Sequence, residues 1–247
     1  MREETITAGD VRLRVQHRRV PEPTGPPVLL IHGMAADHRT WRRTVRALSA
    51  AGRDTVTYDQ RGHGRSDHSP EYLLDELAQD AEHVARYAGL EEFDVVGHSL
   101  GGQAALRLAW RLPDGVRRLV LEEMPPVAQE ESQLAESMDL PLTPRRVWLG
   151  IKQVVQTPGA LSRFDGTMMD SVSPQFRPDP AWWERLSATP QETLVISGGP
   201  RDFLRPEYLR LVADALPRGE YLELRGGHTV HRESSAAFAR AVLDFLR

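Results

Sequence analysis

The residues best suited to chemistry are a serine, an aspartate and a histidine, Ser99, Asp202 and His228, which occur in this order along the chain. A serine hydroxyl is a weak nucleophile at neutral pH until a base removes its proton, and a histidine with a pKa of about 6.5 is suited to do so. A buried carboxylate fixes the tautomer of that histidine and stabilises its protonated form. Together the three side chains predict attack on an acyl carbon by the serine.

Ser99 lies within the sequence GHSLG at residues 97–101. The apolar run Val95-Val96 before it predicts a short buried strand, and the alanine- and leucine-rich residues 104–112 after it predict a buried helix. The two flanking glycines are expected because a Cβ there would collide with the neighbouring strand and helix. The serine would then stand on a strained turn, and the N–H of Leu100, at the amino end of the helix, could stabilise an oxyanion.

Strands and helices alternate along most of the chain. After a hairpin around residues 8–10, strands are predicted at 28–31, 55–58, 94–96, 119–121, 193–196 and 221–224, and helices at 39–51, 72–87, 104–112, 206–215 and 236–246. This alternation predicts an α/β fold with a mostly parallel sheet of about eight strands flanked by helices. Because parallel strands end at one edge of a sheet, Ser99, Asp202 and His228, each just past a predicted strand, can converge there.

The alternation breaks between residues 125 and 190, where prolines and helical fragments replace the strand pattern. We expect a helical cap at 125–190, inserted into a core formed by 1–124 and 191–247, and placed over the carboxyl ends of the strands. The cap carries large apolar side chains that could line a pocket for a hydrophobic acyl or aromatic group: Trp148, Met168, Met169, Trp182 and Trp183. Packing of the cap on the core explains any one of them equally well.

The composition excludes several classes of partner. The 247 residues are 40% hydrophobic and 27% charged, as in a soluble globular protein, and the net charge of −4 argues against a nucleic-acid partner. Without cysteine there is no disulfide, thiolate metal site or cysteine nucleophile. Residues 1–5 lack the apolar segment of a secretory signal, and no stretch is long enough to cross a bilayer, so we expect a cytoplasmic enzyme acting on a small molecule. The oligomeric state is not indicated.

Four stretches of the sequence resemble the α/β-hydrolase superfamily. They are His32-Gly33 after a strand, the pattern DxRGxGxS at 59–66, the sequence GHSLGG at 97–102, and the pattern GxxDxxxP at 199–206 together with Gly227-His228. The resemblance implies an α/β-hydrolase fold with nucleophile Ser99, acid Asp202 and base His228. It further implies an oxyanion hole formed by the N–H groups of Met34 and Leu100, with no metal and no organic cofactor.

Alternatives remain at several positions. Glu123 is a second candidate for the acid, because some members of the superfamily carry their carboxylate after the preceding strand. We expect His231, at a predicted helix start, to be a solvated or capping residue, and His32 and His98 to pack or hydrogen-bond beside the site together with Gly33. The other histidines are expected at the surface: His17, His38, His63, His68 and His83. Asp59 and Arg61 are expected to form a structural pair.

A serine at residue 99 excludes the haloalkane dehalogenases and epoxide hydrolases of the superfamily, which use an aspartate there. We therefore expect hydrolysis of an ester, thioester or lactone of a small hydrophobic molecule through an acyl-enzyme. The same side chains could also support carbon–carbon bond hydrolysis, cofactor-free perhydrolysis or a biosynthetic cyclase or lyase reaction. A scaffold that binds a ligand without turnover is a further hypothesis.

Overall fold

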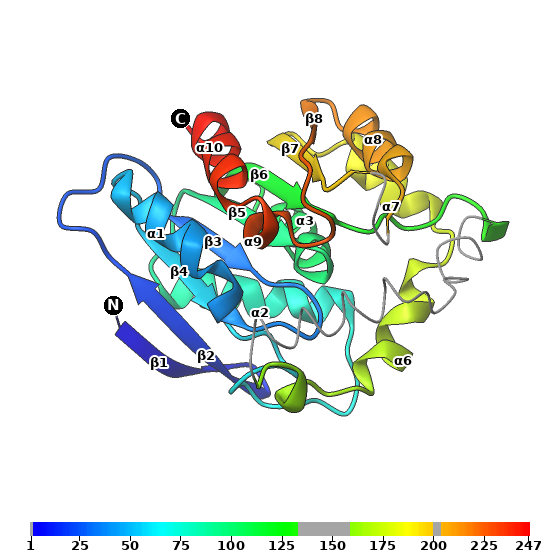
Figure 1. Ribbon diagram of the computed structural model, residues 1–247. Helices are drawn as coiled ribbons and strands as arrows, with labels where there is room; N and C mark the ends of the chain where they lie inside the picture. Colours follow the sequence, from blue (N-terminus) through cyan, green and yellow to red (C-terminus); the bar gives the residue numbers. More distant parts are fainter. Residues whose placement is uncertain (1, 133–158, 200–203) are drawn as a thin grey trace.

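The centre of the molecule is a sheet of eight strands in the order β1-β2-β4-β3-β5-β6-β7-β8 (Figure 1). The structure is a computed structural model that describes residues 2–132, 159–199 and 204–247. The strands are β1 (Arg2–Ala8), β2 (Val11–Arg18), β3 (Val28–Ile31), β4 (Thr55–Tyr58), β5 (Phe93–His98), β6 (Val116–Glu122), β7 (Glu192–Ser197) and β8 (Gly219–Glu223). Strand β2 pairs antiparallel with β1 and β4, and the remaining pairs are parallel.

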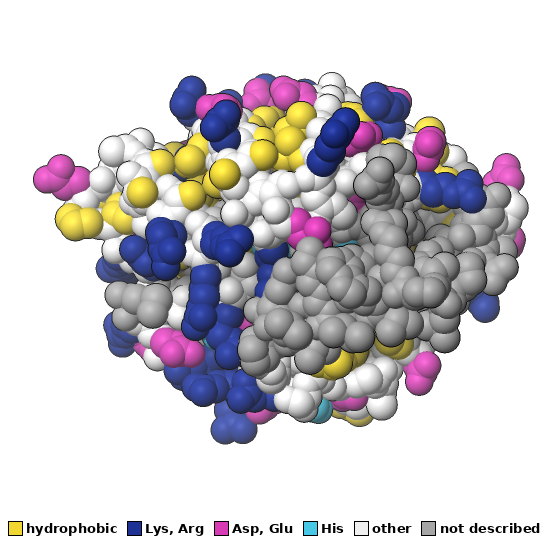
Figure 2. All heavy atoms as spheres, in the orientation of Figure 1, with side chains coloured by type: hydrophobic (Ala, Val, Ile, Leu, Met, Phe, Trp, Pro, Cys, Tyr) yellow, Lys and Arg dark blue, Asp and Glu magenta, His cyan; other side chains and the backbone are white. Residues whose placement is uncertain are grey.

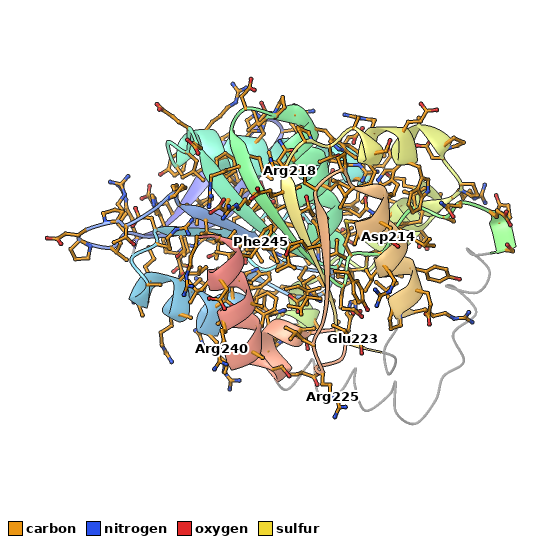
Figure 3. The ribbon with its side chains drawn as sticks, turned by 90° about the horizontal axis from the view of Figure 1, so that it is seen from above. Asp214, Arg218, Glu223, Arg225, Arg240 and Phe245 are labelled. Atoms are coloured by element: carbon orange, nitrogen blue, oxygen red, sulfur yellow. The ribbon has the colours of Figure 1, made fainter. Side chains whose placement is uncertain are left out.

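Helices cover both faces of the sheet because its central strands are apolar on both sides. In β3, Val28 and Leu30 belong to one hydrophobic core and Leu29 and Ile31 to the other. One core is closed by α1 (Arg42–Ala50) and α10 (Ser235–Phe245), and the other by α2 (Leu74–Tyr87), α3 (Leu100–Arg111) and α8 (Pro206–Ala215). Figure 3 shows α10, with Arg240 and Phe245, beside α1. None of the described helices is long and apolar enough to cross a membrane.

The predicted α/β fold, with about eight mostly parallel strands, is confirmed. Strands β3 and β4 begin and end at the predicted residues, since each is a short run of apolar and β-branched side chains between breaks. The helix expected at 39–51 instead opens as a 3₁₀ turn, η1 (His38–Trp41), before α1 begins. The carboxylate of Asp37 caps this turn by accepting the N–H of Arg39 at 3.0 Å.

The regular elements described between β6 and β7 are short helices. They are η2 (Leu161–Arg163), α6 (Met168–Val172), η3 (Ser173–Phe176) and α7 (Pro180–Ser187), and this described part of the segment contains no strand. The segment packs against the start of α2, where the hydroxyl of Tyr72 donates to Asp165 at 2.7 Å and the N–H of Leu74 donates to Gln175 at 2.9 Å. The division into a core and a cap at 125–190 stays a prediction.

The loop after β4 is held from two sides. Arg61 donates to the carboxylate of Asp80 at 2.7 and 2.9 Å and to that of Glu76 at 2.9 Å, which fastens the loop to α2. Asp59 lies 2.6 Å from Nδ1 of His38 and accepts its N–H at 2.9 Å, which fastens the loop to η1. Asp59 and Arg61 therefore brace this loop separately, rather than as the pair that we expected.

Candidate active site

Ser99 stands on a strained turn between β5 and α3. Its φ of 52° and ψ of −119° lie in a region that L-residues rarely adopt. A Cβ at Gly97 would overlap the carbonyl oxygen of Gly101, and a Cβ at Gly101 would overlap that of His32, so both glycines are required. The N–H of Ser99 donates to the carbonyl of Glu122 at 2.8 Å. These contacts hold a partly buried serine at the carboxyl edge of the sheet.

His228 lies within hydrogen-bonding distance of Ser99. Its Nε2 is 3.1 Å from Oγ of Ser99, and it reaches this position from the loop that follows β8. The His228 side chain is 23% exposed, so a substrate or a water molecule can approach the pair. The geometry allows Nε2 to accept the hydroxyl proton, as a general base must.

The carboxylate beside His228 in the described residues is that of Glu123. Its Oε2 is 3.3 Å from Nδ1 of His228, and its Oε1 accepts the N–H of Gly198 at 2.6 Å. Glu123 is fully buried and follows β6 directly, with a φ of 48° that turns it away from the strand. The structure thus brings the second candidate acid into contact with the histidine. Asp202, the acid predicted first, lies outside the described residues.

Backbone strain is concentrated at this edge of the sheet. In the described part of the chain, three non-glycine residues have a positive φ: Ala35, Ser99 and Glu123. All three flank the space around Ser99, one in the loop after β3, one on the turn and one after β6. Strained residues persist where the surrounding structure holds them, and they cluster at functional sites. The sequence carried no signal for this strain apart from the position of Ser99.

The predicted oxyanion hole combines two backbone groups near Ser99. Leu100 is the first residue of α3, where an N–H has no acceptor inside the helix. Met34 follows Gly33, where a Cβ would lie 3.1 Å from Cβ of Ser99. The loop that carries Met34 is held by the N–H of Ala35, which donates to Nε2 of a buried histidine, His63, at 3.1 Å. The role of Met34 and Leu100 stays a prediction.

Two buried histidines fix the loops around the predicted oxyanion hole. Nδ1 of His32 donates to the carbonyl of Gly33 at 2.8 Å and its Nε2 accepts the N–H of Gln60 at 3.1 Å, so His32 packs and bonds as we expected. His63 is fully buried, and the prediction of a surface histidine there is wrong. A glycine-rich loop has no periodic pattern from which burial can be predicted. Burial lowers the pKa of His63 to about 3, so its imidazole is neutral and can accept from Ala35.

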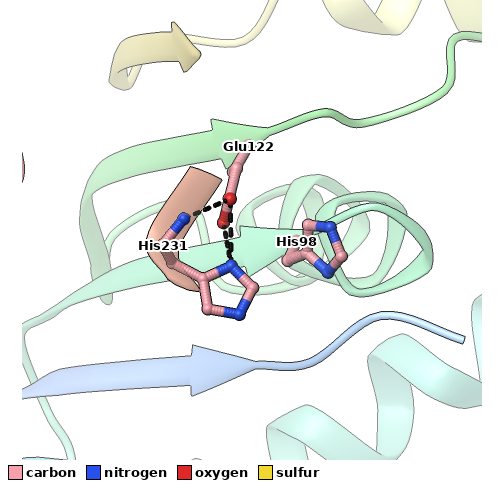
Figure 4. Close-up of side chains that lie close together, drawn as sticks. All are labelled: His98, Glu122 and His231. Atoms are coloured by element: carbon pink, nitrogen blue, oxygen red, sulfur yellow. Dashed lines mark hydrogen bonds and ion pairs between the residues drawn. The ribbon is translucent and has the colours of Figure 1, made fainter. Parts of the chain in front are cut away.

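Figure 4 shows a second glutamate–histidine pair, formed by Glu122 and His231. Glu122 accepts the backbone N–H of His231 at 2.8 Å and its Nδ1–H at 2.7 Å, and Nε2 of His231 lies 2.6 Å from the hydroxyl of Thr40. Trp41 stacks on His231 with ring centroids 4.3 Å apart. His231 is only 1% exposed, so the expected solvated or capping role is wrong. The chain turns inward at α9 (Val230–Glu233) and carries His231 under the sheet edge.

His98 lies between the two pairs. Its Nε2 donates to the carbonyl of His228 at 2.6 Å, and its ring centroid is 4.9 Å from that of His228 and 5.0 Å from that of His231. Burial lowers the pKa of His98 to about 3 and also lowers that of His231. Burial raises the pKa of Glu122 to about 7. His98 therefore packs and hydrogen-bonds beside the site, as we expected.

The same three side chains could be considered for a metal ion. In the described residues, one ligand atom each of His98, Glu122 and His231 lies within 4.8 Å of the others. Both ring nitrogens of His231, however, already have hydrogen-bond partners in Glu122 and Thr40. The donor set therefore fits a closed hydrogen-bond network better than a metal centre, in which the ligand nitrogen must be free.

The residues predicted to line a cap pocket occupy different environments. Met168 and Trp182 are buried in the hydrophobic core, and Trp183 packs edge-on against Trp182 with centroids 4.9 Å apart. Trp182 also faces Trp110, near the end of α3 away from Ser99. Met169 is 48% exposed. Core packing accounts for the buried members, and Trp148 lies outside the described residues.

Comparison with known proteins agrees with this architecture. A family model for the alpha/beta hydrolase fold matches residues 26–160, which is more than half of the chain. The chain belongs to the α/β-hydrolase fold family, and the resemblance found in its sequence is confirmed. Hydrolase activity is the general activity that this membership supports.

Individual relatives carry hydrolase names. The chain is 25% identical over 257 residues to the sn-1-specific diacylglycerol lipase ABHD11 of Mus musculus, covering 91% of this chain and 82% of that protein. It is 26% identical over 255 residues to a putative esterase/lipase of Haemophilus influenzae, covering 95% and 88%. The solved structure of the enol-lactonase from Burkholderia xenovorans LB400 has a TM-score of 0.75 and 22% identity, covering 98% of this chain and 99% of that chain. At that identity the structural similarity shows the fold alone.

Proposed function

We propose that this hydrolase cleaves a carboxylic ester, thioester or lactone of a small hydrophobic molecule through an acyl-enzyme on Ser99. The observation that carries the proposal is the 3.1 Å approach of Nε2 of His228 to a serine held on a strained turn. The lipase and esterase names of the relatives support the same chemistry.

In the first half of the reaction, His228 takes the hydroxyl proton as Oγ of Ser99 attacks the acyl carbon. The N–H groups of Leu100 and Met34 receive the negative charge on the former carbonyl oxygen. The carbon–oxygen bond to the leaving alcohol then breaks, and the alcohol takes the proton from His228. Ser99 is left as an ester of the acyl group.

In the second half, His228 removes a proton from water, and the resulting hydroxide attacks the acyl carbon. Collapse of the intermediate releases the carboxylic acid and returns the proton to Ser99. We propose that Glu123 orients Nδ1 of His228 and stabilises its charged form in both halves. The contact of 3.3 Å with His228 and the N–H that Gly198 donates to the same carboxylate support this assignment.

The test is hydrolysis of p-nitrophenyl esters, acetate through laurate, by wild type and by Ser99→Ala. We expect turnover with a chain-length optimum, and a loss of about 10⁴- to 10⁶-fold in kcat for the variant. Thr40→Val is the matched control, because it removes a hydroxyl that also contacts a histidine but is buried. Activity that survives Ser99→Ala, or a folded wild type that cleaves none of the esters, would contradict the proposal.

A further inference from the structure

A cavity of about 470 Å³ opens beside the amino end of α1, and neither Ser99 nor His228 lines it. Its wall combines residues of β1, β2, η1, α1, the loop after β4 and η2. Six of the lining residues are arginines: Arg18, Arg39, Arg42, Arg46, Arg65 and Arg163. Figure 2 shows arginine side chains gathered over α1 and the β1–β2 hairpin on this face. The cavity is concave and carries an excess of positive side chains.

The acidic residues in the wall do not neutralise this excess. Asp37 is held by Arg39, whose Nε donates to it at 2.9 Å. Asp59 is held by His38, with Nδ1 at 2.6 Å. Glu3 accepts from Arg14, which does not line the cavity, at 2.8 Å. Each carboxylate therefore already has its own partner.

The other five arginines have no such partner. Within residues 2–132, 159–199 and 204–247, none of Arg18, Arg42, Arg46, Arg65 and Arg163 forms an ion pair with a carboxylate. Arg42 and Arg46 are four residues apart on α1, where like charges repel and destabilise a helix. Convergence of unpaired cations from four separate segments costs stability, unless an anion binds among them.

The lining defines the chemistry of the anion. Arginine presents a planar fork of donors that matches phosphate and carboxylate oxygens in pairs. Val45 is the single apolar side chain among the lining residues, so the cavity offers little to a hydrophobic ligand. A volume near 470 Å³ is that of a small-molecule site rather than of a single monovalent ion. The best match is a group with several phosphate charges.

The cavity lies next to the loop that carries Met34, because Asp59 and His38 in its wall are hydrogen-bonded to each other. Asp59 accepts the N–H of His38 at 2.9 Å through one oxygen and the N–H of Arg65 at 2.9 Å through the other. Asp59 thereby joins the loop after β4, which contributes Arg65 to the cavity, to the turn that follows Met34. An occupant of the cavity would lie beside the predicted oxyanion loop without touching Ser99.

We infer that this arginine-lined cavity is a binding site for a phosphate-bearing group, either a soluble polyphosphorylated molecule or the headgroup of an anionic phospholipid. The two sources share the same recognition, several phosphate oxygens received by Arg42, Arg46 and Arg65. The site is independent of the proposed esterase reaction, and its test does not require turnover.

The test measures binding of inorganic tripolyphosphate by calorimetry, and of phosphatidylcholine vesicles with and without phosphatidic acid by co-sedimentation. The variant is Arg42→Gln with Arg46→Gln, since glutamine keeps helix propensity and removes two charges. The matched control is Arg177→Gln with Arg240→Gln, which removes two exposed charges outside the cavity. Thermal melting verifies that both variants fold.

We expect wild type to bind at least one probe, with affinity that falls as salt rises. The cavity variant should lose at least about tenfold in affinity, because each charge-assisted contact is worth roughly that factor, while the control keeps wild-type affinity. Tripolyphosphate binding alone identifies a soluble ligand, and phosphatidic acid binding alone identifies a headgroup. Absence of binding to both probes, or equal losses in the two variants, would overturn the inference.

Discussion

Two sets of a carboxylate, an imidazole and a hydroxyl lie close together at the carboxyl edge of the sheet. Glu123, His228 and Ser99 form one set, with contacts of 3.3 and 3.1 Å. Glu122, His231 and Thr40 form the other, with contacts of 2.7 and 2.6 Å. The second set has the shorter hydrogen bonds, yet the first is the one that we propose to be catalytic.

The difference lies in solvent access and backbone strain. His231 and Glu122 are buried, so no substrate can reach the hydroxyl of Thr40, and burial keeps the pKa of His231 low and its ring neutral. Ser99 is partly exposed and held at a φ of 52°, and His228 reaches solvent. A carboxylate, an imidazole and a hydroxyl in contact are therefore insufficient to define an active site. Good hydrogen-bond geometry in a closed space gives stability instead.

The largest expected effects come from exchanging the two histidines for alanine. His228→Ala removes the general base, so we expect kcat to fall by about 10⁴-fold or more with little change in the melting temperature. His231→Ala removes buried hydrogen bonds and leaves a cavity, so we expect a loss of about 2–4 kcal/mol in unfolding free energy. Its kcat should remain within about tenfold of wild type. Ester kinetics and denaturant unfolding of both variants, compared with wild type, test whether His228 serves activity and His231 serves stability. Equal losses of kcat and of unfolding free energy in the two variants would contradict this division.

A smaller effect on kcat separates the candidate carboxylates. Glu123→Gln keeps the shape of the side chain but removes the charge beside Nδ1 of His228, so we expect kcat to fall by about 10²- to 10⁴-fold. Asp202→Asn is the matched change at the residue first predicted from sequence, and we expect it to stay within about tenfold of wild type. If kcat falls further in Asp202→Asn than in Glu123→Gln, Asp202 and not Glu123 is the carboxylate that supports His228.

The smallest expected effect is a change of unfolding free energy with pH, which arises from Glu122 in the buried pair with His231. Burial raises the pKa of Glu122 from its ordinary value of 4.5 to about 7. A carboxyl whose pKa is raised on folding stabilises the protein fully below about pH 4.5, and this contribution is lost as the pH rises to about 7. We expect the stability of wild type relative to Glu122→Gln to decline across that window and to level off above it. Urea unfolding at a series of pH values tests this, and a difference that stays flat from pH 4.5 to 7 would refute it.

The strands and the strained turn could be predicted from sequence because their signals are local. Residues 28–31 and 55–58 are short apolar runs, and the glycines around Ser99 follow from the space that a strand and a helix leave between them. The order of the serine and histidine along the chain, combined with the parallel sheet, was sufficient to predict that Ser99 and His228 meet.

The sequence could not predict which of the neighbouring glutamates, Glu122 or Glu123, contacts His228, because this depends on where strand β6 ends. Glu122 is the last residue of β6 and stays on the side where Val120 packs, whereas Glu123 leaves the strand with a positive φ and turns toward His228. A one-residue change in that boundary would exchange their environments. The burial of His63 and His231 likewise depends on loop paths that have no sequence period.

His98 has a consequence for the order in which the protein becomes reactive during synthesis. It contacts the carbonyl of His228, a residue 130 positions later in the chain. A nascent chain that already contains the turn with Ser99 therefore lacks both the base and the clamp that positions it. In the proposed reaction, substrate therefore cannot acylate Ser99 until the last part of the sheet has been translated and has docked.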